Sequence, residues 1–304
     1  MTALTLKIAI DRTPYTEALF NGTVASERVD FDFISVQPIT RAFRRMVRGL
    51  EFDACEIALA TLSVAHRFEI PITGIAATLL REYPLSKLVC LQDSPLRQGA
   101  NLRGRRIAVR SYSQTTAVWV RGLLQSEYGV DAKDVVWLTQ EDSHVSQLGR
   151  QPFEQPWEDE IPLYDALTSG VADAAITLHL GGHSDIRTVV PDADRICQDW
   201  FARRQAQPIN HLLAVKSSLL REHDWLAAEL STLFERARCC ADGSDPAPWN
   251  NEGASLLLRF CAQQGLTPHP YSPETLIANY PATRFPARGL PVRAVPITHP
   301  LEPS

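Results

Sequence analysis

The chain has 304 residues, of which 45% are hydrophobic and 21% charged, and its formal net charge is −5. A chain of this size buries a sizeable core and is expected to divide into two lobes, because single cores stop growing at roughly 250–300 residues. The acidic balance gives no electrostatic footprint for nucleic acid, and no apolar run approaches the roughly 20 residues of a membrane helix. We therefore expect a protein without a nucleic-acid partner or a membrane span.

The N-terminal residues and the cysteines indicate the cellular compartment of the protein. Residues 1–10 run directly into an apolar strand, without a basic segment, a hydrophobic stretch and a cleavage site. The 6 cysteines show no CxxC spacing, which favours reduced thiols and argues against a structural zinc. The sequence thus predicts a cytoplasmic protein with no metal site.

The first part of the chain alternates between strand and helix patterns. We expect strands at 6–10 and 30–36 and a helix over 39–50. The strand-like run 51–60 carries Glu56 among apolar residues, where a carboxylate is costly unless another group pairs with it. Two further strands are expected at 72–79 and 87–91.

The stretch 104–129 is the most informative part of the sequence. It reads as a short strand, a polar break and a helix over 115–128 that Gly129 closes. Four hydroxyl-bearing residues crowd the start of this helix: Ser111, Ser113, Thr115 and Thr116. A helix start offers unpaired N–H groups and a partial positive charge, so this unit predicts a carboxylate or phosphate site. The simpler alternative is that one hydroxyl only caps the helix.

The later part continues the alternation and suggests the division into lobes. Strands at 134–139 and 173–178 flank a polar excursion over 140–160, and a glycine-rich loop with His179 follows. This pattern predicts α/β architecture. Connectors near 93–103 and 206–211 predict one lobe of residues 1–92 and 209–304, with a middle lobe of 93–208 inserted into it. The proline-rich tail from Pro281 is expected to wrap the surface or a neighbouring subunit of a homodimer.

Several segments resemble the 4,5-dihydroxyphthalate decarboxylase family. They are Glu51-Phe-Asp-Ala-Cys-Glu56, Leu102-Arg-Gly-Arg-Arg-Ile-Ala-Val109, Thr115-Thr-Ala-Val-Trp-Val-Arg-Gly-Leu-Leu124 with Glu127-Tyr-Gly-Val130, Ile209-Asn-His211, Gln264-Gly-Leu-Thr267 and Ser272-Pro-Glu274. The resemblance implies the fold of type II periplasmic binding proteins, with a ligand cleft between two lobes. The chain departs from the family at Pro84-Leu85, where the family tends to carry Arg-His, and at His179, where it often has Arg.

The resemblance implies cofactor-independent decarboxylation of a hydroxylated or dihydroxylated aromatic carboxylate. Such a reaction needs a base near the phenol, a proton donor near the ring carbon, and contacts for the retained carboxylate. The titratable candidates near expected strand ends or the lobe junction are Glu56, His179 and His211. The candidate substrate contacts are Arg12, Arg81, Ser86, Ser113, Gln114, Thr115 and Thr116.

Each titratable candidate also has a structural alternative. His211 could bond only a backbone carbonyl, Glu56 could be a structural partner, and His179 could be exposed. At the level of function, the alternative is a cytoplasmic binding protein of the same fold that holds a small aromatic or aliphatic carboxylate without catalysis. The loss of the Arg-His pair favours this alternative or a changed substrate. A metal-dependent enzyme has little support, because no His/Asp/Glu cluster shows ligand spacing.

Overall fold

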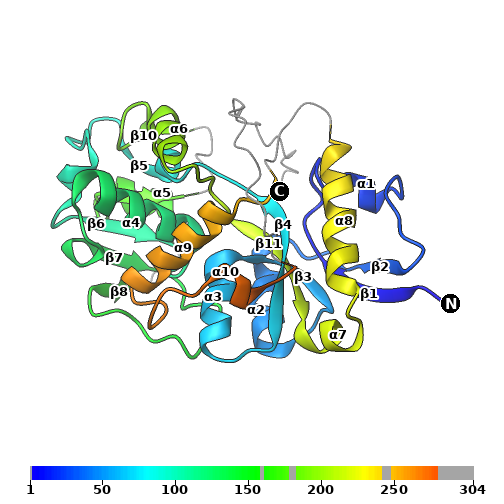
Figure 1. Cartoon of the computed structure of the whole chain (residues 1–304). Coiled ribbons are helices and arrows are strands. Elements are labelled where there is room, and N and C mark those ends of the chain that lie inside the picture. Colours follow the sequence, from blue (N-terminus) through cyan, green and yellow to red (C-terminus); the bar gives the residue numbers. More distant parts are fainter. Residues whose placement is uncertain (1, 158–160, 178–182, 242–247, 280–304) are drawn as a thin grey trace.

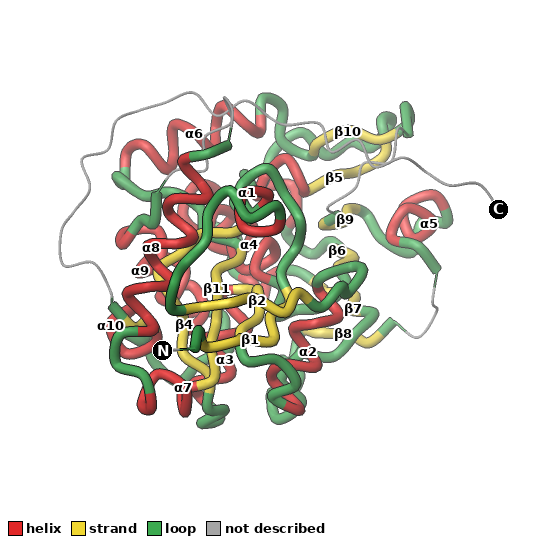
Figure 2. Tube along the Cα trace, turned by 90° about the vertical axis from the view of Figure 1, so that its right-hand side faces the viewer, coloured by secondary structure: helices red, strands yellow, loops and turns green. Residues whose placement is uncertain are grey.

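The computed structural model describes residues 2–157, 161–177, 183–241 and 248–279. Two six-stranded mixed sheets form the framework, and Figures 1 and 2 both show their strands in separate halves of the molecule. The α/β class predicted from the alternation of elements is confirmed. His179 and the tail from Pro281 lie outside the described residues.

The first sheet has the strand order β12-β4-β11-β3-β1-β2. Its strands are β1 (Leu4–Ala9), β2 (Val29–Phe33), β3 (Ala54–Ala58), β4 (Ile72–Leu80), β11 (His211–Lys216) and β12 (Ile277–Ala278). β11 runs antiparallel to both neighbours, β3 and β4, whereas β1 runs parallel to β2 and β3. A strand from late in the chain therefore lies in the middle of a sheet built mostly from its first 80 residues.

The second sheet has the order β10-β5-β9-β6-β7-β8. Its strands are β5 (Leu88–Leu91), β6 (Arg106–Val109), β7 (Val136–Thr139), β8 (Glu154–Pro156), β9 (Ala174–Ile176) and β10 (Ile186–Thr188). β6 pairs in parallel with β7 and β9, and β5 joins β9 in the antiparallel sense. The parallel centre places the carboxyl ends of β6, β7 and β9 at one edge of the sheet.

Helices cover both sheets. They are α1 (Glu17–Phe20), α2 (Thr40–Gly49), α3 (Leu59–Arg67), α4 (Thr115–Tyr128), α5 (Leu163–Thr168), α6 (Ala193–Arg203), α7 (Ser217–Glu222), α8 (Leu226–Cys239), α9 (Asn251–Gln263) and α10 (Pro273–Leu276), with short 3₁₀ turns η1 (Pro84–Lys87), η2 (Gly99–Leu102) and η3 (Ala132–Asp134). α9 packs against both α3 and α4, and thereby joins the two halves (Figure 1). No helix in the described part is long and apolar enough to cross a bilayer.

The chain crosses from the first sheet to the second between Leu80 and Leu88. β5 falls within the range 1–92 expected for the first lobe, yet it pairs with β9 and β10 of the second sheet, so this crossing precedes Asp93. A short buried strand reads the same in sequence whichever sheet it joins. The return crossing lies between Thr188 and His211.

The expected strand-like run 51–60 divides into two elements. β3 ends at Ala58, and α3 begins at the next residue. Residues 59–65 of α3 are all buried, so the hydrophobic periodicity that marks a surface helix is lost there. The helix expected over 115–128 is observed with those bounds, and Gly129 closes it with a φ of 63°.

Candidate active site

A buried carboxylate–imidazole pair joins the two antiparallel neighbours β3 and β11. The pairing sets Glu56 opposite Leu213 and His211 opposite Ala58. The Nδ1 atom of His211 lies 2.7 Å from Oε1 of Glu56, and the exposed fractions of the two side chains are 11% and 4%. The second oxygen of Glu56 accepts the backbone N–H of Asp11 at 2.9 Å. Both carboxylate oxygens therefore accept a hydrogen bond, which offsets the free-energy cost of burying Glu56.

The hydrogen bond to Glu56 determines which nitrogen of His211 is available. A carboxylate only accepts hydrogen bonds, so Nδ1 of His211 carries a proton and donates it. Within the described part of the chain, Nε2 has no hydrogen-bond partner, and it is not among the fully buried unpaired atoms. Nε2 is therefore the atom that can exchange a proton with a bound molecule. Glu56 holds the ring in place, and both of its own oxygens are engaged, by His211 and by the N–H of Asp11.

Two helix starts meet beside this pair. The N–H of Leu59, the first residue of α3, donates to the backbone oxygen of Asn210 at 3.0 Å, and the next N–H, of Ala60, donates to the hydroxyl of Thr115 at 3.1 Å. Thr115 is itself the first residue of α4. The positive ends of both helix dipoles therefore converge near His211.

The start of α4 keeps unpaired donors. Among the residues that the structure describes, the backbone N–H groups of Thr115, Thr116 and Ala117 have no hydrogen-bond acceptor. Within the described ranges, the hydroxyl of Ser113 bonds only that of Ser111, at 3.3 Å. Unpaired N–H groups at a helix start are able to bind a carboxylate or phosphate, as the sequence pattern predicts for this turn.

Asn210 connects these parts and was not among the residues singled out from the sequence. Its side chain donates to the hydroxyl of Thr116 at 3.2 Å and accepts the N–H of Glu82 at 3.0 Å, while its own N–H bonds Leu80 at 2.9 Å. It lies directly before His211 and is 1% exposed. The residue therefore fixes the start of α4 relative to the first sheet, a role its place in Ile209-Asn-His211 alone does not reveal.

A second histidine, His144, lies close by and was given no role from the sequence. Its Nδ1 is 3.2 Å from the hydroxyl of Thr61 and its Nε2 is 3.4 Å from Nη1 of Arg110. Burial, followed by the charges of Arg110 and Arg44, lowers the pKa of His144 to about 3. The ring is neutral near pH 7, with Nδ1–H donating to Thr61 and Nε2 accepting from Arg110.

Phe43 connects the two histidines. Its ring lies edge-on to His211 at 4.9 Å and to His144 at 5.6 Å between ring centroids. Next to it on α2, Arg44 shares one carboxylate with Arg110: both reach Oε2 of Glu141, at 3.1 and 3.0 Å. The side chains of Arg44 and Arg110 are 40% and 26% exposed, and the two positive charges share one carboxylate, so this side of the site carries an excess of positive charge.

The chain matches no protein-family model. It is 28% identical over 254 residues to a 4,5-dihydroxyphthalate decarboxylase of Comamonas testosteroni, an alignment that covers 79% of this chain and 77% of the relative. A 4,5-dihydroxyphthalate decarboxylase of Pseudomonas putida is 27% identical over 214 residues, which cover 66% of this chain and 83% of the relative. The resemblance to 4,5-dihydroxyphthalate decarboxylases is confirmed.

Solved structures agree with the fold that this resemblance implies. The periplasmic aliphatic sulphonate binding protein SsuA of Escherichia coli superposes with a TM-score of 0.57 at 13% identity, over 97% of this chain and 98% of that chain. The sulfonate-binding protein SsuA of Methylobacillus flagellatus gives 0.52 at 11% identity, over 91% and 92%. At such identities the likeness shows the fold alone, and the periplasmic-binding-protein fold is confirmed.

The substrate contacts proposed from the decarboxylase resemblance fall into two groups. Ser113, Gln114, Thr115 and Thr116 gather at the start of α4, and Oε1 of Gln114 is buried there with no partner among the described residues. The hydroxyl oxygens of Thr115 and Thr116 accept from Ala60 and Asn210, which leaves the proton of each hydroxyl, like the backbone N–H groups of this turn, able to donate to an anion.

The other expected contacts have partners of their own, and Arg81 directly follows Leu80, which lies opposite His211 in the sheet. Arg12 is exposed, pairs with Glu17 at 2.7 Å and lies over the ring of Phe20, because the turn after β1 directs it outward. The guanidinium of Arg81 bonds Gln207, and the hydroxyl of Ser86 donates to the oxygen of Tyr83 at 2.8 Å. His179 is outside the described residues. The structure also brings His144, through Phe43, and the pair of Arg44 and Arg110 to the neighbourhood of His211.

Metal ligation was not expected from the sequence. Over the described ranges, no group of three His, Cys, Asp or Glu side chains is placed to hold a metal ion. The donors that do converge are cationic groups, helix-start N–H groups and imidazoles, a set suited to an anionic organic molecule.

Proposed function

We propose that the chain is a decarboxylase of a hydroxylated aromatic carboxylate, acting without a cofactor. The curated relatives, both named 4,5-dihydroxyphthalate decarboxylase, support the reaction class. The observation that carries the proposal is the His211–Glu56 pair, which leaves Nε2 without a partner among the described residues, directly after Asn210, whose side chain bonds Thr116 at the start of α4. A site that only binds an anion needs the N–H groups but has no need of an oriented proton donor.

The proposed reaction replaces the carboxylate with a proton. A hydroxyl para to the carboxylate-bearing carbon supplies electron density to that carbon while its own proton moves to solvent. The imidazolium of His211, held by Glu56, donates its Nε2 proton to the same carbon. The bond to the carboxylate then breaks, its electron pair restores the aromatic ring, and CO₂ leaves. His211 and the phenolate oxygen of the product each regain a proton from solvent. Because the phenol released one proton at the start, the net reaction consumes one proton in each turnover.

The remaining groups bind and orient the substrate. The N–H groups of Thr115, Thr116 and Ala117 hold a retained carboxylate at the start of α4. Arg44 and Arg110, which share Glu141, offer a second contact for an anionic group of the substrate. We therefore expect a substrate with two carboxylates, such as a dihydroxyphthalate, to bind better than the corresponding hydroxybenzoate.

The proposal is tested by incubating the purified protein with a panel of hydroxylated phthalates and benzoates. CO₂ release and the shift in melting temperature are measured on the same samples, for the natural chain and for His211→Gln. His66→Gln is the matched control, because His66 is exposed at the far end of α3. Release with the natural chain and the control, but not with His211→Gln, supports the proposal. A melting shift without release from any compound would instead identify a binding protein.

A further inference from the structure

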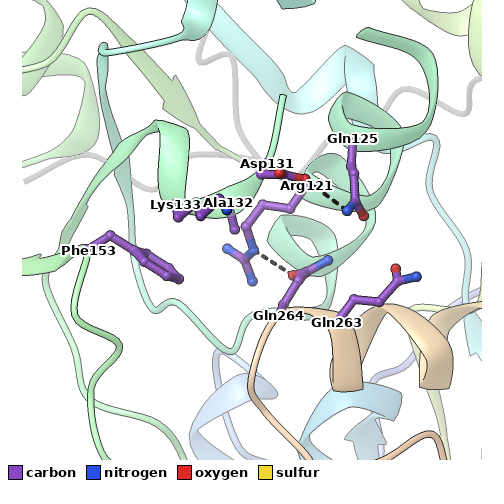
Figure 3. A pocket seen from close by; sticks show the side chains of 8 residues that line it. All are labelled: Arg121, Gln125, Asp131, Ala132, Lys133, Phe153, Gln263 and Gln264. Carbon is purple, nitrogen blue, oxygen red and sulfur yellow. Dashed lines mark hydrogen bonds between the residues drawn. The ribbon is translucent and has the colours of Figure 1, made fainter. Parts of the chain in front are cut away.

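A cavity of about 240 Å³ lies away from His211, at the back of α4. Exposed side chains surround its mouth, and two buried side chains, Arg121 and Gln264, form its floor. The residues that line it are Arg121, Gln125, Asp131, Ala132, Lys133, Phe153, Gln263 and Gln264 (Figure 3). They come from α4, η3, the turn before β8 and the end of α9, so the cavity lies where the C-terminal part of the chain meets the second sheet.

Arg121 is the unusual member of this lining. It is 2% exposed and, in the described part of the chain, forms no ion pair; the carboxylate whose charge acts on it, Glu154, does so from beyond ion-pair distance. Its Nε donates to Oε1 of Gln264 and its Nη2 to the backbone oxygen of Tyr112, each at 2.6 Å. Its Nη1 is fully buried and has no partner among the described residues. A buried charge without a counter-ion is costly, which calls for an explanation of why this one is retained.

Two aromatic rings and burial act in opposite directions on the charge of Arg121: the rings attract it, and burial disfavours it. The guanidinium stacks on the rings of Tyr112 and Trp137, at 3.8 and 4.9 Å from their centroids, which directs its nitrogens sideways. Burial lowers the pKa of Arg121, because the surroundings disfavour its charged form. Figure 3 shows the guanidinium between Phe153 and Gln264, on the side of the cavity where Lys133 lies.

The charges of the lining favour an anion overall. Lys133 is exposed at the mouth, and among the described residues it forms no ion pair. The one acidic group, Asp131, is already engaged: it accepts the side-chain amide of Gln125 at 2.9 Å and the N–H of Asp134 in a capping box. We propose that this cavity is a second binding site, for a small oxyanion such as a carboxylate or phosphate, that pairs with Arg121.

The site is tested by soaking crystals with 4-iodobenzoate, whose iodine is located by anomalous scattering, and separately with inorganic phosphate. The neutral analogue 4-iodobenzamide is the ligand control. We expect density for at least one oxyanion against Arg121 and none for the amide. The position of the density distinguishes this site from the His211 site, so the outcome does not depend on the proposed decarboxylation. Empty cavities with both oxyanions would overturn the inference.

Variants test the same site in solution by isothermal titration with whichever oxyanion is seen. Arg121→Met should weaken binding by roughly tenfold or more, because a charge-assisted contact is lost. Lys133→Glu changes only the mouth of the cavity and should weaken oxyanion binding roughly fivefold. This variant still tests the proposal if Arg121→Met fails to fold. Arg221→Glu on α7 is the matched control, since it reverses an exposed charge away from the cavity. Equal affinities in Lys133→Glu and Arg221→Glu would contradict the proposal.

Discussion

The carboxylate of Glu56 holds Nδ1 of His211 at 2.7 Å, although the two residues are 155 positions apart in the chain. The contact depends on the antiparallel register of β3 and β11, which brings the end of one strand to the start of the other. It leaves Nε2 of His211 without a partner in the described part of the chain, and the starts of α3 and α4 lie close to the same strand end. The proposed catalysis rests on this arrangement.

Replacing Glu56 with Gln should separate positioning from binding. The amide cannot supply the negative charge that orients His211 and stabilises its protonated form, so kcat should fall roughly 100-fold while the dissociation constant of the substrate changes little. Steady-state kinetics of Glu56→Gln and of the natural chain, with the pH profile of kcat, measure the change in kcat. Glu141→Gln is a useful contrast, because it releases Arg44 and Arg110 and should change KM rather than kcat. An unchanged kcat and pH profile in Glu56→Gln would remove Glu56 from the account.

His144 should make the free energy of unfolding depend on pH. Its pKa is lowered from 6.5 to about 3 in the folded chain, so the unfolded chain binds a proton at a pH where the folded chain does not. Stability from the neutral ring is present above the unfolded pKa and is lost as pH falls from 6.5 toward 3. Urea unfolding at pH 7.5 and pH 5 should therefore show an acid-induced loss about 2 kcal/mol smaller in His144→Gln than in the natural chain. Equal losses in the two proteins would show that His144 does not stay neutral.

The contact between α4 and α9 should tolerate no added methyl group. A Cβ at Gly122 would overlap the ring of Phe260. Overpacking of this kind costs about 1–3 kcal/mol, which outweighs the gain of about 1 kcal/mol in helix propensity. Chemical unfolding of Gly122→Ala should thus show lower stability, whereas Gly49→Ala, with open space around it at the end of α2, should be neutral or slightly more stable. A stabilised Gly122→Ala would mean that α9 packs differently.

Thiol reactivity should follow burial. Cys239 and Cys240 are exposed, while Cys55, Cys90, Cys197 and Cys261 are buried, and none of the six forms a disulfide. Burial raises the pKa of Cys197 and Cys261 to about 12, which leaves almost no reactive thiolate. Ellman's reagent should label two thiols rapidly in the folded protein and six after denaturation. Rapid labelling of more than two would show that the core opens.

Much of the fold could be predicted from the sequence, because its helices and strands carry strong local signals. The strand before the Ser111 turn, the helix over 115–128 and its closure at Gly129 all follow from periodicity and from the αL preference of glycine. The same local signals do not report strand partners. For that reason the sheet to which β5 belongs could not be read from the residues.

The site was predictable only in part, for the same reason. Glu56 and His211 were identified by type and position, but their contact needed the register of β3 and β11. His144 lies in the polar excursion over 140–160, which has no periodicity, and its place is set by Thr61 and Arg110 from distant segments. Arg12 was also identified by type and position, as a cation near a strand end, but its side chain is exposed and pairs with Glu17.

The most direct test of the central claim measures turnover and ligand affinity together for His211→Gln, with a compound that the natural chain decarboxylates. We predict that kcat falls roughly 100-fold or more, because the proton donor is lost, while the dissociation constant stays within about threefold, because the N–H groups of α4 and the two arginines still hold the ligand. A variant that retains full kcat would contradict the role of His211 as the proton-transfer group.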